Sequence, residues 1–127
     1  MLKYLDRSLL IGPYIALCMS EKAFDKELRK LGIENPPAFM GKNGHATTHY
    51  FDNEKRGLIC VVCIKHDTSK TPIQVMALLA HEAVHIWQAF VDFINEKNPS
   101  SEMEAYAVQN ILQSLGEAYP KAIRWTR

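Results

Sequence analysis

The strongest constraint on the fold is one long helix, whose start is marked by four consecutive residues from Thr71 to Gln74. Thr71 can cap the helix, Pro72 suits its first position, and Gln74 can complete a capping box with Thr71. Apolar residues then continue to about Ile94, which predicts a helix of about six turns. The rest of the chain has to pack against this helix.

A strand and a short helix are predicted near the N-terminus. The apolar pattern from Pro13 to Met19 indicates a short strand. Ser20 can cap a helix that runs from Glu21 to Leu31, and Gly32 is suited to end it.

A hairpin precedes the long helix, and a second helix follows it. The segments His45 to Phe51 and Leu58 to Ile64 have strand character and are joined by a polar turn. After residues 98–99, Asn-Pro, a helix is predicted to about Leu115, and the segment from Tyr119 onward is predicted to be irregular. The pattern predicts a single α+β domain over residues 1–127 with a small, mainly antiparallel sheet.

The net charge and the hydropathy of the chain limit the classes of binding partner that we expect. The formal net charge is +1, and no dense run of Lys and Arg occurs, so we expect neither nucleic acid nor membrane as a partner. The apolar stretch after Lys3 and Arg7 lacks a signal-peptide cleavage pattern and is too short to cross a bilayer. We therefore expect a cytoplasmic protein.

The cysteines predict core packing and not a metal site. Three cysteines, Cys18, Cys60 and Cys63, are too few for a disulfide-stapled secreted scaffold. Cys60 and Cys63 have C-x-x-C spacing, but residues three apart on a strand point to opposite faces. We expect both thiols to be buried as small apolar groups.

The residues most typical of a catalytic metal site form the H-E-x-x-H motif from His81 to His85. Residues four apart on a helix share one face, so both imidazoles can reach one zinc ion. Zinc lowers the pKa of a coordinated water toward ~7, and Glu82 is placed to accept its proton. The alternative is a pair of surface histidines. Apolar flanking residues disfavour it by predicting a buried stretch: Ala80, Ala83, Val84, Ile86 and Trp87.

A third ligand is expected from the second helix, since catalytic zinc usually has three protein ligands. Two carboxylates compete for this role. Glu104 follows Ser101 by three residues, so it can serve in a capping box instead. Glu102 shares a helix face with the small Ala105, and we prefer it as the ligand.

The motif at residues 81–85, followed by Glu102-x-x-Ala105-Tyr106, resembles the gluzincin metallopeptidases. The small size is similar to that of the minigluzincins and the compact metallopeptidase-like proteins of phage origin. The resemblance covers about residues 57–112. Relatives often have Asp or Asn where this chain has Tyr106.

The resemblance implies a zinc peptidase. It implies that His81, His85 and Glu102 bind Zn²⁺, that Glu82 is the general base, and that the strand Leu58 to Ile64 pairs with an extended substrate. The expected substrate is a peptide or protein. The alternative function is a zinc-containing regulatory or interaction protein with weak or no activity.

Three aromatic side chains have open roles. Tyr106 can steady a zinc-binding histidine, polarise the substrate carbonyl, or lie in the core. On a strand, His45 and His49 share a face but lie about 13 Å apart, which is too far to bind one ion together. His49 can serve as an oxyanion donor, or it can be an ordinary surface residue of the strand.

The C-terminal segment from Gly116 to Arg127 is expected to pack back onto the domain, because it carries Tyr119, Ile123 and Trp125. Two placements are open. The segment can cross the cleft as an inhibitory plug, which the resemblance to minigluzincins allows, or it can bury its aromatic residues in the core.

Overall fold

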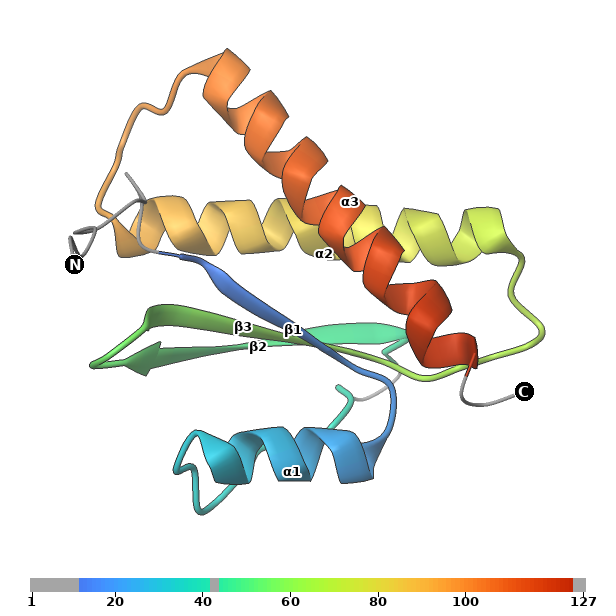
Figure 1. The fold of residues 1–127 in the computed structure, drawn as a ribbon. Coiled ribbons are helices and arrows are strands. Elements are labelled where there is room, and N and C mark those ends of the chain that lie inside the picture. The colour runs from blue at the N-terminus through green and yellow to red at the C-terminus, as the bar shows by residue number, and fades with distance from the viewer. Residues whose placement is uncertain (1–11, 42–43, 125–127) are drawn as a thin grey trace, which may run out of the picture.

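The computed structural model describes the backbone of residues 12–41 and 44–124, and side chains as far as Tyr119. A sheet lies between one helix on one face and two helices on the other (Figure 1). The elements are β1 Tyr14–Cys18, α1 Glu21–Lys30, β2 Ala46–Asn53, β3 Gly57–Ile64, α2 Pro72–Phe93 and α3 Ser101–Arg124. The predicted α+β class is confirmed. Within the described ranges, no helix is long and apolar enough to cross a membrane.

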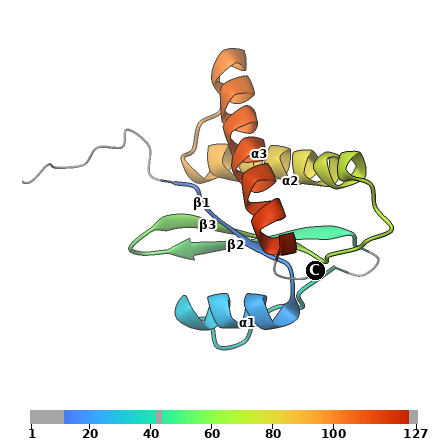
Figure 2. The ribbon, with the colours of Figure 1, turned by 45° about the vertical axis from the view of Figure 1, so that its right-hand side comes forward.

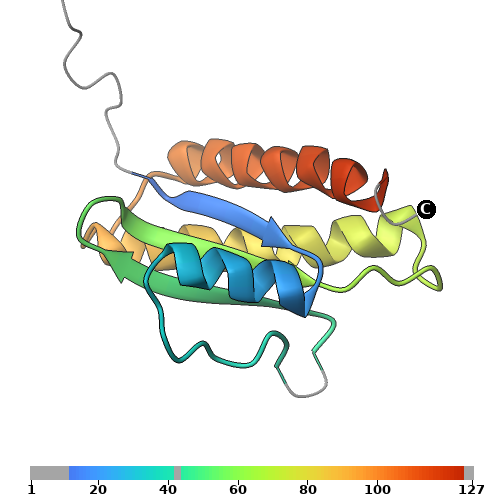
Figure 3. The same cartoon turned by 60° about the horizontal axis from the view of Figure 1, so that its bottom comes forward.

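The three-stranded sheet is mixed, so the prediction of a mainly antiparallel sheet is wrong. Its order is β1-β3-β2, with β3 parallel to β1 and antiparallel to β2. The helix α1 and the loop after it carry the chain over one face to the far edge of the sheet (Figure 3). The predicted hairpin turn then reverses the chain direction. As a result, β3 lies between β1 and β2 and runs parallel to β1.

The central strand β3 is buried on both faces. Its side chains alternate between a cluster beneath α2 and α3, which contains Cys60, and a cluster beneath α1, which contains Cys63. Both cysteines are free, and burial raises the pKa of each to about 12. The predicted core role of these thiols is confirmed.

Capping residues set the helix boundaries. Ser20 Oγ accepts a hydrogen bond from the backbone N–H of Ala23 at 3.1 Å, and Gly32, with φ of 79°, follows the end of α1. At α2, Thr71 Oγ1 accepts from the Gln74 N–H at 3.2 Å, and Gln74 Oε1 accepts from the Thr71 N–H at 2.8 Å. The predicted capping box is therefore present.

The helix α3 crosses in front of α2 in Figure 2, on the same face of the sheet, and is longer than predicted. It continues to Arg124, so the prediction of an irregular segment from Tyr119 is wrong. Ile111, Leu115 and Tyr119 follow one another at one-turn intervals, and all three are buried in the cluster beneath α2 and α3. This packing extends the helix and places Tyr119, 8% exposed, in the core. Trp125, the other aromatic residue of the suggested plug, lies outside the described residues.

Candidate metal and catalytic site

The two motif histidines meet on the exposed face of α2. His81 Nε2 and His85 Nε2 are 3.1 Å apart, with the rings edge to face. Two nitrogens that each bind one tetrahedral zinc at about 2.0–2.1 Å would lie about 3.3 Å apart. The pair is therefore spaced as two ligands of one ion.

The histidines are exposed, so the prediction of a buried stretch is wrong for them. The core side of α2 carries Ala83, Ile86 and Trp87. Residues 81 and 85 therefore lie on the side of the helix that faces solvent. The exposure leaves the imidazoles accessible to an ion from solution.

Gln88 fixes the ring of His85. Gln88 Oε1 lies 3.1 Å from His85 Nδ1. In the tautomer that donates from Nδ1 to this oxygen, His85 Nε2 has a lone pair on the side of the ring that faces His81.

The motif glutamate points away from solvent and toward the sheet. Glu82 is 5% exposed, and its Oε1 accepts a hydrogen bond from Thr48 Oγ1 of β2 at 3.2 Å. A carboxylate buried in this way is desolvated and held in one orientation, as a proton acceptor for catalysis requires.

Tyr50 lies on the same face of β2 as Thr48, two residues along the strand. Burial raises the pKa of Tyr50 to about 12, electrostatic interactions with Cys60 and Glu82 add to the rise, and a hydrogen bond with Thr48 lowers it. The phenol is therefore a proton donor at neutral pH. Sequence reasoning missed Thr48 and Tyr50, because strand alternation groups them but does not say which face meets α2.

His49 lies on the other face of β2. Its Nε2 is 3.2 Å from the carbonyl oxygen of Phe39, and its ring centroid is 4.9 Å from that of Phe24 in α1. The sheet therefore separates His49 from Glu82, and the suggested oxyanion role is not supported.

A cavity of about 710 Å³ opens beside the motif. Its walls come from the start of β2, the turn before α2 and the first half of α2. The lining residues are His45, Ala46, Ser69, Lys70, Gln74, Ala77, Leu78, His81 and Glu82. The first imidazole of the motif and the buried carboxylate thus border the same space.

The second helix does not bring a carboxylate to the histidines. Glu104 Oε2 accepts a hydrogen bond from Trp87 Nε1 at 2.9 Å, on the core side of α2. Glu102 is two residues earlier, about 200° around the helix, and it is exposed. Among the residues with described placement, no group of three or more His, Cys, Asp and Glu could hold a metal.

The predicted capping box of Ser101 and Glu104 does not form either. The N–H of Met103 bonds to Ser100 Oγ at 3.1 Å, so Ser100 caps α3. Glu104 is free to bond Trp87 instead, which fixes the rotation of α3 about its own axis.

Tyr106 does not line the cavity beside the motif. It is 62% exposed, which excludes a core role, and it lines a separate cavity of about 480 Å³ with Trp87 and Phe90. The structure therefore does not bring Tyr106 to the histidine pair.

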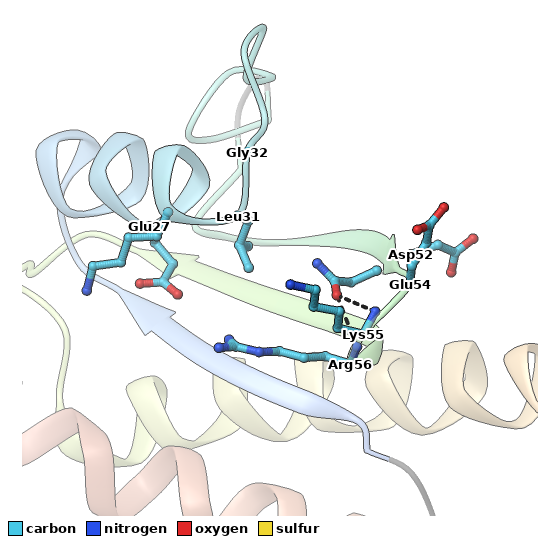
Figure 4. A pocket seen from close by; sticks show the side chains of 9 residues that line it. Glu27, Leu31, Gly32, Asp52, Glu54, Lys55 and Arg56 are labelled. Atoms are coloured by element: carbon cyan, nitrogen blue, oxygen red, sulfur yellow. Dashed lines mark hydrogen bonds between the residues drawn. The ribbon is translucent and has the colours of Figure 1, made fainter.

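A third cavity, of about 680 Å³, lies between the end of α1 and the hairpin turn (Figure 4). Its charged residues balance in sign: Glu27, Asp52 and Glu54 against Lys30, Lys55 and Arg56. Asn53 Oδ1 accepts the N–H groups of residues 55 and 56 and so holds the turn. This cavity presents no surplus charge for a ligand.

The expectation that Leu58 to Ile64 pairs with a substrate is wrong, because β3 is hydrogen-bonded on both sides. The edge strand that faces Glu82 is β2, whose outer side has no partner strand among the described residues.

The structure thus gathers His81, His85, Glu82 and Gln88 at one place and leaves Glu102 and Tyr106 elsewhere. In comparisons with known proteins, the chain matches no family model, no curated protein and no solved structure.

Proposed function

We propose that this protein is a zinc-dependent hydrolase, a peptidase of gluzincin type, in which His81 and His85 bind the ion and Glu82 is the general base. The observation that carries the proposal is the 3.1 Å separation of the two Nε2 atoms beside a buried carboxylate that borders the same cavity as His81. Paired surface histidines without a metal would not need a desolvated glutamate next to them.

The donor set suits zinc, which prefers neutral imidazole nitrogens. The ion, when bound, supplies a Lewis acid that polarises a substrate carbonyl and acidifies water. Glu82 accepts the proton of the attacking water and passes it to the leaving amine nitrogen, which keeps the proton count balanced. Thr48 holds the carboxylate in position for both transfers.

A peptide substrate is supported by the free edge of β2. An extended peptide can add to an exposed strand edge through backbone hydrogen bonds. Bound there, its scissile carbonyl would lie near the face that carries Thr48 and Tyr50, and the protonated phenol of Tyr50 is the nearest candidate for an oxyanion donor.

The test is Glu82→Gln, which keeps the shape of the side chain and removes its basicity. Zinc content, measured by elemental analysis, should remain as in the wild type. Chelator-sensitive cleavage of a peptide library should fall at least ~10²-fold, the usual scale for loss of a general base. Cleavage at the wild-type rate would contradict the proposed function.

A second candidate function is a zinc-containing regulatory or interaction protein with weak or no activity. It is favoured by the exposure of both histidines and by the lack of a third ligand grouped with them among the described residues, because a partner could complete the coordination. In that case Glu82→Gln would change nothing, whereas His81→Ala would abolish zinc-dependent association.

A further inference from the structure

We propose that Gln88 is a positioning residue of the histidine pair, because its side-chain oxygen selects the tautomer of His85 that carries the proton on Nδ1. The inference rests on the proposed zinc site and concerns how the protein prepares that site before an ion binds. Gln88 lies three residues after His85 on the same face of α2, and its Oε1 is 3.1 Å from His85 Nδ1.

The two contacts of the His85 ring are coupled through its one proton. A neutral imidazole has one N–H donor and one nitrogen acceptor. When Nδ1 donates to Gln88, Nε2 has to accept, and the atom 3.1 Å from it is His81 Nε2. His81 is then the donor of that bond and carries its own proton on Nε2. Gln88 therefore sets the tautomers of both histidines in the metal-free protein.

The other polar side chains of this part of α2 have separate partners. Glu82 accepts the hydroxyl of Thr48 on the sheet side of the helix, and Gln74 bonds the backbone of Thr71 at the helix start. In the described part of the chain, the hydrogen bond to His85 Nδ1 comes from Gln88.

The coupled tautomers give the two histidines different tasks when an ion binds. His85 has the lone pair of Nε2 available, whereas His81 has to release the proton on Nε2 and take one up on Nδ1. Both rings are exposed, so water accepts and supplies these protons, and the charge of the pair does not change. Loss of a hydrogen bond that orients a metal-binding histidine lowers metal affinity by about 10–100-fold.

The first test is the tautomeric state of the metal-free protein. Long-range ¹H–¹⁵N spectra of histidine-labelled protein distinguish the two ring nitrogens, and at about pH 8.5 an unperturbed imidazole is neutral. The wild type should show His85 protonated on Nδ1 and His81 protonated on Nε2. Gln88→Leu removes the acceptor and should shift the population of His85 toward the Nε2–H tautomer. Packing alone would not produce this change, because Gln88 is exposed.

The second test is zinc affinity, measured by competition with a chromophoric chelator. Gln88→Leu should bind zinc about 10–100-fold more weakly than the wild type. Gln88→Glu keeps an acceptor beside Nδ1, so it should retain the wild-type tautomers and bind zinc at least as tightly. Gln113→Leu is the matched control, since Gln113 is an exposed residue of α3 that bonds Glu117, and it should change neither measurement.

A wild-type His85 with its proton on Nε2 would overturn the inference. Wild-type tautomers or wild-type zinc affinity in Gln88→Leu would overturn it as well. A wild-type chain that binds no zinc would contradict the proposed function, and the spectra of the metal-free protein would then still decide whether Gln88 positions the pair.

Discussion

Glu82 is held in place by one described hydrogen bond, from Thr48, and by burial against the sheet. A hydrogen bond to a charged group contributes about 1.5–3 kcal/mol, so its loss should let the carboxylate leave this orientation. Thr48→Val, which keeps the volume and removes the hydroxyl, should lower the hydrolysis rate about tenfold.

Zinc content should not change in Thr48→Val, because Thr48 does not touch the histidines. Thr48→Ser restores the hydroxyl and should restore most of the rate. Equal rates for the valine and serine variants would show that Thr48 acts by packing alone.

The proximity of the two motif histidines has a local signature in the sequence. His81 and His85 are four apart on one helix, and this spacing alone brings their nitrogens together. Thr48 and Tyr50 were not assigned to the site, because their approach to Glu82 of α2 depends on how the sheet packs against the helix. The sequence spacing of residues 45–50 does not predict which face of this strand contacts α2.

The helices differ in whether their ends are determined by neighbouring residues in the sequence or by packing against other elements. The caps at Ser20 and Thr71 define α1 and α2 through hydrogen bonds over three residues, so these starts could be predicted. The last turns of α3 depend on the burial of Tyr119 against other elements. The sequence predicted an irregular segment from Tyr119 onward, and tertiary packing overrides that prediction.

The bond between Trp87 and Glu104 joins α2 and α3. Glu104→Ala leaves the partly buried indole N–H without its acceptor, which should lower the free energy of unfolding by about 1–3 kcal/mol. Chemical denaturation measures this loss. Zinc content should remain as in the wild type, because this carboxylate lies on the core side of α2.

Glu102→Ala is the matched control on the same helix turn, and it should change neither stability nor zinc content, since Glu102 is exposed. A loss of zinc in Glu102→Ala, with stability retained, would restore the ligand expected from the gluzincin resemblance.

At the scale of the whole molecule, the sheet separates two environments. The α1 side holds a closed apolar cluster with His49, whereas the α2 side holds Glu82, Thr48 and the cavity next to the histidines. The α+β class follows from the order of elements along the chain. The mixed sheet does not, because the parallel pairing of β1 with β3 joins residues more than 40 positions apart.

The central claim is that His81 and His85 bind one zinc ion, and the most direct measurement is the zinc content of the purified protein. Elemental analysis should give one zinc per chain in the wild type, and zinc should raise the thermal midpoint, because binding to the folded state alone stabilises it by about 2.7 kcal/mol at 100 times Kd. His81→Ala should lose both the zinc and the stabilisation. A wild-type chain without zinc, or a His81→Ala variant that keeps it, would contradict the account.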